Sequence, residues 1–393
     1  MRVLFVTPRA LGDPRSGGTI KSAALLAYLE RRHEVDVACF VQPGEGAEPD
    51  AKWRRTGQTI AIRLRRPRSA GRLVASYGRR IPLSIERNRS RALADAVRGL
   101  VATRGHDAVF IDGWLMAQYL PAGYGGRTLL HQHNAEHVMW RRQAALERTS
   151  HRRAVLRLEA SRVRRYEAAM LSRFDVVFAV SEPDRSALLL LDPGLDVRIL
   201  PNVPDPSLLG RPPLEPATDP VLLFFGTLSW QPNVEGVERF LRGAFPALRG
   251  QIADVRMVLA GSGASEALAS LAARTPGVEF LGAVPEDEPL YRRARAFVDL
   301  GMGGSGTRVK LLNALARGLP AVATRDAARG LEIVPGEHLL VTDEPSGAVA
   351  PLVRVLTDDD LWRHLSRHGR ELVRVRYLPE VAFADLDDAL GDG

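Results

Sequence analysis

The sequence predicts an α/β protein with two doubly wound, Rossmann-like domains that face each other across a cleft. The chain has 393 residues, too many for one ordinary domain. Continuous apolar runs alternate with helical stretches, which is typical of parallel strands buried on both faces. A proline-dense stretch interrupts this alternation, and the alternation then restarts. We therefore expect an N-terminal domain over residues 1–200, a linker over 201–220, a C-terminal domain over 221–375 and a tail over 376–393 that packs back on the first domain.

The first half opens with the strand-like run RVLFVT, a turn-rich segment and a helical pattern from Thr19 to about Arg32. Later runs that predict strands are EVDVACF, TIAIRL, DAVFID, RTLLHQ, DVVFAV and VRILP. One long, arginine-rich helix is expected from about Val138 to Arg173.

The second half repeats the alternation. Its strand candidates are PVLLFFG, VRMVLAG, VEFLG, AFVDLG and LPAVAT. Helices are expected after Asn233, from about Ala264, near Pro289 and from about Thr307, and further helices in the tail. Ligands of such sheets bind beyond the carboxyl ends of the strands, so the informative loops are those that follow strands.

Composition indicates a globular protein, with 45% hydrophobic and 25% charged residues. No apolar run approaches the roughly 18 residues that cross a bilayer, and no signal peptide is evident, so a cytoplasmic location is expected. The single cysteine, Cys39, excludes an internal disulfide framework. Residues 1–200 hold 34 Lys and Arg against 20 Asp and Glu, whereas the remainder is acidic overall. This asymmetry suggests an anionic partner or a solvated arginine surface; a nucleic-acid role is not expected, because the arginines lack interleaved aromatic residues.

The stretch GMGGSGTRVKLLN follows the apolar run AFVDL. Its glycines allow close approach of the backbone to a ligand, and a helix that begins near Thr307 would direct amide groups toward an anion. Arg308 and Lys310 add positive charge. The segment therefore predicts a diphosphate site.

Two other loops have a related character. In PRSGGTIK, Gly17 and Gly18 would open the first helix, and a plain tight turn is an equally good interpretation. Gly226 ends another strand-then-glycine turn, in FFGTLSWQPN. No complete dinucleotide motif, Walker A lysine, nucleophile elbow or aspartate cluster for a metal is present.

The segment LLHQHNAEH carries His131, His133 and His137. His133 and His137 have the spacing of metal ligands on a helix, but the pattern is not H-E-x-x-H, and no metal is expected. A histidine that reaches from a strand end into the cleft as a hydrogen-bond donor is the preferred interpretation.

Together these segments resemble the GT-B fold glycosyltransferases, and specifically retaining enzymes of glycosyltransferase family 4. The resemblance includes LFVTPRALGDPRSGGTIKS, HNAEH, AVSEPDRSALL, FFGTLSWQPNVEGV, VEFLGAVPE and GGSGTRVKLLNALARGLPAVAT. It implies transfer of a sugar from a nucleoside-diphosphate donor to a hydroxyl acceptor, which is a natural product, a saccharide or a lipid-linked molecule, without a metal or other cofactor. It further implies that the acceptor binds the N-terminal domain.

The resemblance also assigns roles to residues. His133 would lie near the transferred sugar, and Arg308 and Lys310 would stabilise the departing diphosphate. The donor would bind the C-terminal domain through Gly226, Val284, Ser305, Gly306, Thr307 and Asn313, and Gly17 and Gly18 would approach the phosphates from the other domain. Val284 belongs to the loop that would hold the base.

The sequence departs from the family where two glutamates are usual, because Ser305 and Asn313 stand there. The alternatives are a donor with a different nucleotide sugar ring, a site that tolerates asparagine, or a weakly active relative. An inactive GT-B auxiliary protein and a nucleotide-sugar epimerase are the competing functions. The arginine-rich N-terminal segments Arg54–Arg104 and Arg141–Arg173 suggest a peripheral contact with an anionic membrane, which would suit a lipid-linked acceptor.

Overall fold

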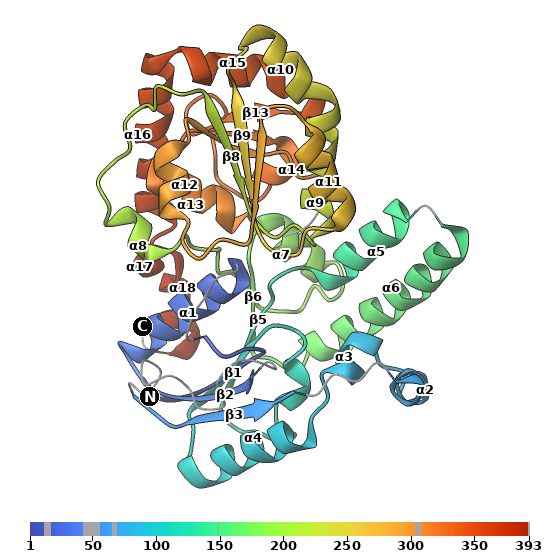
Figure 1. Cartoon of the computed structure of the whole chain (residues 1–393). Helices are drawn as coiled ribbons and strands as arrows, with labels where there is room; N and C mark the ends of the chain where they lie inside the picture. Colours follow the sequence, from blue (N-terminus) through green and yellow to red (C-terminus); the bar gives the residue numbers. More distant parts are fainter. Residues whose placement is uncertain (12–16, 42–55, 65–68, 148, 303–307, 392–393) are drawn as a thin grey trace. The chain divides into compact units, whose positions relative to one another are not determined.

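A computed structural model describes residues 1–11, 17–41, 56–64, 69–147, 149–302 and 308–391 (Figure 1). The chain divides into two compact units, one formed by Met1–Pro201 with Ala382–Gly393, and the other by Asn202–Val381. The described part of the chain contains no helix with the length and apolar character that spanning a bilayer requires.

The first unit is built on a seven-stranded sheet of order β3-β2-β1-β4-β5-β6-β7, in which every neighbouring pair is parallel. Strands β1, β4 and β6 are almost wholly buried, which explains why they read as continuous apolar runs. The strands are β1 Arg2–Thr7, β2 Glu34–Val41, β3 Thr59–Arg63, β4 Ala108–Asp112, β5 Arg127–His131, β6 Val176–Ala179 and β7 Val197–Ile199.

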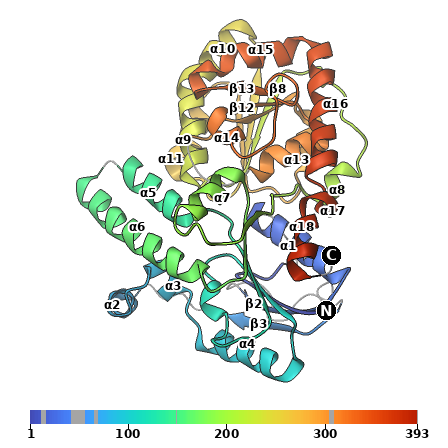
Figure 2. The same cartoon turned by 180° about the vertical axis from the view of Figure 1, so that it is seen from behind.

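Helices α1 and α4 cover opposite faces of this sheet (Figure 1). The helices of the unit are α1 Gly17–Glu30, α2 Ala70–Gly78, α3 Leu83–Arg87, α4 Arg91–Arg104, the 3-10 turn η2 Ala117–Tyr119, α5 Glu136–Leu146, α6 Ser150–Leu171, α7 Glu182–Leu189 and α18 Ala384–Leu390. Helices α5 and α6 lie side by side as a helical hairpin (Figures 1 and 2).

The single arginine-rich helix expected from Val138 to Arg173 is therefore wrong, because two helices stand there. Glu147 leaves the helical conformation at φ −66° and ψ 124°. Its carboxylate accepts a hydrogen bond from the backbone N–H of Thr149 at 2.8 Å, and its carbonyl accepts one from Arg153 Nε at 2.8 Å. These local bonds replace the helical ones and end α5.

The second unit has a six-stranded parallel sheet of order β10-β9-β8-β11-β12-β13. Its strands are β8 Val221–Phe225, β9 Arg256–Ala260, β10 Val278–Gly282, β11 Ala296–Asp299, β12 Ala321–Thr324 and β13 Leu340–Thr342. Its helices are α8 Pro206–Leu209, α9 Gln231–Arg239, the π-helical turn η3 Phe240–Ala244, α10 Phe245–Gln251, α11 Glu266–Arg274, α12 Glu288–Arg293, α13 Val309–Arg317, α14 Arg325–Ala328, the 3-10 turn η4 Pro345–Ala348, α15 Val349–Thr357, α16 Asp359–Arg376 and α17 Pro379–Ala382.

Two parallel sheets with interleaved helices confirm the predicted fold class of two Rossmann-like domains. In both sheets the strand order reverses beside the first strand of the unit, β1 or β8. The carboxyl ends of β1 and β4, and of β8 and β11, therefore mark the places where such folds bind ligands.

Candidate functional site

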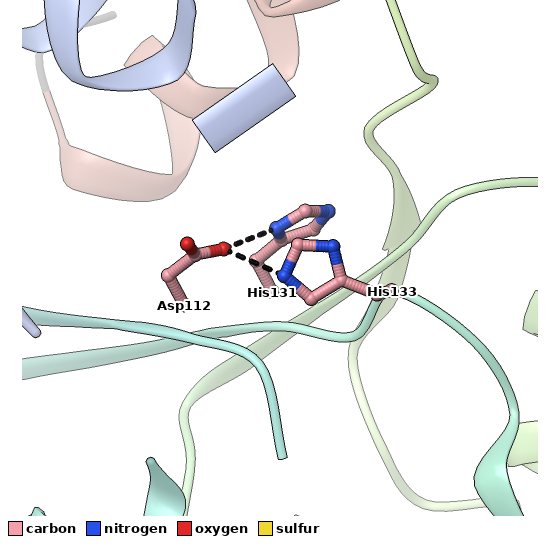
Figure 3. Close-up of side chains that lie close together, drawn as sticks. All are labelled: Asp112, His131 and His133. Carbon is pink, nitrogen blue, oxygen red and sulfur yellow. Dashed lines mark hydrogen bonds and ion pairs between the residues drawn. The ribbon is translucent and has the colours of Figure 1, made fainter. Parts of the chain in front are cut away.

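In the first unit, polar side chains gather around Asp112, the last residue of β4. Its side chain is fully buried. Oδ2 accepts hydrogen bonds from Thr7 Oγ1 at 2.9 Å and from Ser22 Oγ at 2.6 Å. Oδ1 lies 2.9 Å from His131 Nδ1 and 3.0 Å from His133 Nε2. Figure 3 shows both imidazole rings converging on the same carboxylate oxygen. We call these five side chains the Asp112 cluster.

The sheet order explains why these residues meet. β4 lies between β1 and β5, and Asp112 is directly paired with His131. Thr7 ends β1, so three strand ends present polar side chains at one edge. Gly113 follows at φ 91°, where a Cβ would lie 3.1 Å from the ring of His133. Glycine at this position therefore lets the chain turn and the ring pack close to it.

The charges in the cluster are unusual for a protein interior. Burial opposes ionisation of Asp112, but the charge of His133 and hydrogen bonds from His131 and His133 outweigh it and hold the pKa of Asp112 well below its usual value. Burial, together with the charges of Lys21 and His133, lowers the pKa of His131 well below its usual range. Asp112 is thus a carboxylate and His131 a neutral imidazole at neutral pH.

Helix α1 also contributes to the Asp112 cluster. The structure places Gly17 and Gly18 at its amino end, as the sequence suggested. One turn later, Lys21 is fully buried and donates a hydrogen bond to the carbonyl of Leu200. Burial lowers the pKa of Lys21 well below its usual value. The next residue, Ser22, bonds Asp112 and thereby ties α1 to the cluster.

The rest of the HNAEH segment is bound by a buried carboxylate of helix α6. Glu167 of α6 accepts hydrogen bonds from the backbone N–H groups of Glu136 and His137, both at 2.9 Å, and lies 2.7 Å from His137 Nδ1. His137 therefore serves the packing of α5 on α6. Burial and the charge of Glu167 raise the pKa of Glu136 to about 8.

In the second unit, Lys310 lies on the first turn of α13, in a nearly closed environment. Its Nζ is 2.9 Å from Asp299 Oδ1 at the end of β11, and donates to Asn233 Oδ1 at 2.8 Å. The ammonium also stands 4.3 Å from the centre of the Phe224 ring. Burial, reinforced by the charge of Arg308, outweighs the attraction of Asp299 and lowers the pKa of Lys310 to about 8.

Arg308 and Gly226 belong to the same cluster. Arg308 is the residue before α13, and its Nη2 would lie 3.4 Å from a Cβ placed on Gly301. A Cβ on Gly226 would lie 3.3 Å from Lys310 Cδ, so glycine leaves room for the lysine stem. Three of the predicted residues, Gly226, Arg308 and Lys310, are thus brought together. We call these three, with Asn233 and Asp299, the Lys310 cluster.

Asn313 has a role that the sequence did not indicate. It is 6% exposed, one turn after Lys310, and its Oδ1 accepts a hydrogen bond from the backbone N–H of Asp205 at 2.9 Å. Asp205 caps α8 within the proline-dense segment. The amide oxygen expected to face a ligand therefore holds the chain at α8.

The remaining predicted residues are less informative. Val284 lies after β10, half-buried against the core beside α13. Ser305, Gly306 and Thr307 lie outside the described residues. The described helix begins at Val309, two residues later than expected.

Sequence reasoning missed Thr7, Ser22 and Asp112, and also Asp299 and Asn233. The available signal was a carboxylate as the last residue of two strands, in DAVFID and AFVDL, since strand ends carry ligand groups in this fold.

A metal ion is the other occupant to consider for the Asp112 cluster. Asp112, His131 and His133 each offer a ligand atom, and these atoms lie within 4.8 Å of one another. Both histidines, however, direct a ring nitrogen at the carboxylate as hydrogen-bond partners. The charge of the buried Lys21 nearby also acts against a cation there. The ring nitrogens that face Asp112 are thus engaged, whereas His131 Nε2 is buried and has no hydrogen-bond partner among the described residues.

The chain matches two descriptions of known glycosyltransferases. Residues 17–208 match the family described as Glycosyltransferase Family 4, and residues 219–358 match Glycosyl transferases group 1. The chain belongs to these glycosyltransferases. The first match lies almost entirely in the first unit and the second match in the second unit, and they confirm the resemblance found in the sequence.

The glycosyltransferase also resembles solved structures along its whole length. It aligns with sucrose-phosphate synthase from Thermosynechococcus elongatus at 19% identity and a TM-score of 0.70, covering 100% of this chain and 98% of that one. TarM from S. aureus aligns at 9% identity and a TM-score of 0.72, with 99% of each chain covered. HepE from Anabaena, in complex with UDP-glucose, aligns at 14% identity and a TM-score of 0.64, with 100% of each covered. No curated protein matches the sequence. Identities this low establish the shared GT-B fold and nothing finer.

Proposed function

We propose that this glycosyltransferase moves a sugar from a nucleoside-diphosphate sugar to a hydroxyl acceptor, with retention at the anomeric carbon. The observation that carries the proposal is the Lys310 cluster. It combines two cations, a helix start and a glycine-rich strand end in the group 1 domain. A departing diphosphate needs such preorganised positive charge.

Each residue has a part in this proposal. Arg308 and Lys310 take the charge that develops on the leaving diphosphate, and therefore no metal is required for this task. Asp299 and Asn233 hold the lysine ammonium in place until the diphosphate binds. Gly17 and Gly18 approach the phosphates, Val284 lies with the base, and His133 donates a hydrogen bond to the transferred sugar. The bound diphosphate takes the acceptor proton, which explains how transfer proceeds without a pair of carboxylates of the glycosidase kind.

Uridine diphosphate is the first nucleotide to test, because HepE was solved with UDP-glucose. Thermal unfolding of the full chain is measured with millimolar diphosphates of uridine, thymidine, guanosine, adenosine and cytidine. A nucleotide present at 100 times its dissociation constant stabilises by about 2.7 kcal/mol. We expect one clear shift, and we expect Arg308→Ala to abolish it. The absence of any shift would instead favour an inactive auxiliary protein.

Membrane contact is a separate proposal. Exposed arginines such as Arg141 and Arg164 on α5 and α6 would attract anionic lipid at low salt. Co-sedimentation with vesicles that contain phosphatidylserine, at low and high salt, tests it. Equal binding to neutral vesicles would contradict the electrostatic origin.

A further inference from the structure

We propose that Asp112 is a positioning residue, whose carboxylate fixes His133 relative to the amino end of α1. This inference rests on the proposed function, in which His133 and the amino end of α1 both lie at the donor. Asp112 itself touches neither donor nor acceptor in this proposal. It acts through the side chains that it binds.

The first argument is the number of elements that Asp112 joins. Its two oxygens take bonds from β1, α1, the end of β5 and the segment after β5, through Thr7, Ser22, His131 and His133. A single carboxylate has about four acceptor positions, so the described contacts use its full capacity. A fully used, fully buried carboxylate has little freedom to turn, and neither have its partners.

The second argument is that hydrogen bonds through Asp112 connect the amino end of α1 with His133. Ser22 Oγ lies 2.6 Å from Asp112 Oδ2 and 2.9 Å from the carbonyl oxygen of Gly18, and its single proton is shared between these two acceptors. On the other side, Asp112 Oδ1 lies 3.0 Å from His133 Nε2. One residue thus connects the backbone of the first turn of α1 with the histidine ring, over a path of hydrogen bonds only.

The third argument concerns exposure. His133 has 27% of its side chain exposed, whereas Asp112 and His131 have none. In Figure 3 the edge of the His133 ring that bears the other nitrogen points away from Asp112. The cluster therefore presents one half-exposed ring on a buried, charged support. This is the arrangement expected where a side chain must be held in one orientation for a ligand.

The same sheet supplies a matched control. Asp36 of β2 is also fully buried and also lies beside a histidine, with Oδ2 2.8 Å from His106 Nε2 and 2.6 Å from Arg104 Nε. Asp36 pairs with Leu4 in the amino-terminal half of β1, whereas Asp112 lies at the carboxyl end of β4. Asp36→Asn should therefore cost stability as Asp112→Asn does, without an effect on turnover.

The first measurement needs no activity. The full chain is labelled with 15N-histidine, and the ring nitrogens of His131 are observed at pH 7.5, with His131→Gln to assign them. Free imidazole prefers the proton on Nε2, but a bond to Asp112 requires it on Nδ1. We expect the Nδ1–H form in the wild type. The Nε2–H form would show that Asp112 does not accept from His131 and would overturn the proposal.

The second measurement tests the role. Hydrolysis of UDP-glucose to glucose and UDP, with water as the acceptor, or of the nucleotide sugar that the thermal panel selects, is measured for Asp112→Asn, His133→Ala, the double variant and Asp36→Asn. We expect Asp112→Asn to lower kcat by about 10- to 100-fold with the KM for donor changed less than threefold. In the His133→Ala background, Asp112→Asn should lower kcat less than twofold, because the effects of residues that act as a unit are not additive.

The outcomes separate the two proposals. Equal fold losses from Asp112→Asn in both backgrounds, or an equal loss from Asp36→Asn, would overturn the positioning role alone. A wild-type rate in His133→Ala would overturn the assigned role of His133 and the positioning role with it. If the wild type releases no diphosphate from any nucleotide sugar, the proposed function fails, and this inference fails with it.

Discussion

At the scale of single residues, Lys310 has its ammonium held by other protein groups. Its ammonium contacts Asp299, Asn233 and the ring of Phe224 inside the second unit. Asp299 is fully buried, and its Oδ2 has no hydrogen-bond partner among the described residues. Removal of the lysine would therefore leave a buried carboxylate without its cation.

This arrangement separates a stability effect from a binding effect. Lys310→Met should lower the free energy of unfolding by about 3 kcal/mol, because it breaks a buried ion pair on one side only. The double variant Lys310→Met with Asp299→Asn should recover most of the lost free energy of unfolding, but it should not recover donor binding. Denaturant unfolding and the nucleotide-induced thermal shift measure the two effects. A double variant that binds nucleotide like the wild type would contradict the role of Lys310.

The lowered pKa of Lys310 predicts a pH dependence of binding. With a pKa of about 8, the free enzyme loses the ammonium charge as pH rises through 8. The diphosphate remains fully ionised in this range, so its dissociation constant should increase between pH 7.5 and 9.5. Lys310→Arg keeps its charge and should flatten the curve. Titration calorimetry at each pH measures the constant, and an equal slope in both proteins would refute this origin.

The lowered pKa of Lys310 affects folding in the opposite direction. Nucleotide binding should weaken as pH rises, whereas the free energy of unfolding should increase. The unfolded chain, with an ordinary lysine near 10.5, binds more protons than the folded chain between pH 8 and 10.5. The cost of burying the charge is therefore fully present below pH 8 and is relieved as pH rises.

At the scale of elements, helix α13 connects the Lys310 cluster to the proline-dense segment. Asn313 accepts from the backbone of Asp205, and Arg317 donates to the carbonyl of Pro212 at 2.6 Å and to both oxygens of Glu288 at 2.8 Å. The segment expected to be a plain linker is thus bound along one side of α13 and contains the short helix α8.

Asn313→Ala should cost about 1 kcal/mol of stability, because the partly buried N–H of Asp205 loses its acceptor. Asn313→Asp keeps an acceptor oxygen at the same distance and should cost less. Denaturant unfolding of the three proteins tests this order. If both variants are as stable as the wild type, the bond to Asp205 contributes nothing measurable, and Asn313 becomes available again for a role toward the nucleotide.

Glu288 gives this region an acid-sensitive contact. Burial opposes its ionisation, but hydrogen bonds from Arg317, Arg292 and Arg211 outweigh burial and lower the pKa of Glu288 to about 2. Its contribution, about 3 kcal/mol for a shift of this size, is present above pH 4.5 and is lost as pH falls toward 2. Glu288→Gln should remove that part of the pH dependence. Urea unfolding between pH 3 and 6 measures it; parallel curves for the two proteins would contradict the assignment.

The elements could be predicted from the sequence more readily than the clusters. Strands β1, β4, β11 and β12 are mainly apolar before their last residue because both faces are covered, and such runs are visible in any sequence. The Asp112 cluster was not visible, because Thr7 and Ser22 lie 105 and 90 residues from Asp112 and only the strand order joins them. The end of α5 was missed because it depends on local hydrogen bonds from Thr149 and Arg153 to Glu147.

At the scale of the whole molecule, the chain crosses between its units twice. It leaves the first unit after Pro201 and returns at Ala382. The returning helix α18 buries Phe383, Leu386 and Leu390 in the first unit. Tyr28 of α1 donates to Asp387 at 2.7 Å and meets the ring of Phe383 edge-on, and Arg127 Nε donates to the carbonyl of Ala389 at 3.0 Å.

This return predicts an asymmetric effect of truncation. Deletion of residues 382–393 would remove three large buried side chains from the first unit, a loss of at least about 5 kcal/mol. The second unit would lose none of its own core, so its unfolding should be unaffected. Limited proteolysis with mass spectrometry distinguishes the units: fragments from residues 1–201 should appear early, while the region 202–381 stays protected.

Two controls limit the interpretation of that experiment. Deletion of residues 392–393 alone should leave proteolysis unchanged, and Tyr28→Phe should give an intermediate effect because it removes only the bond to Asp387. If both units of the long truncation become equally sensitive, the two halves unfold as one cooperative body, and α18 stabilises the whole enzyme. If neither does, the contacts of α18 add little, and the first unit folds without it.

The wider consequence concerns α1, because Tyr28 lies on the helix whose first turn bears Gly17 and Gly18. Truncation should therefore also weaken nucleotide binding, if that turn contacts the diphosphate.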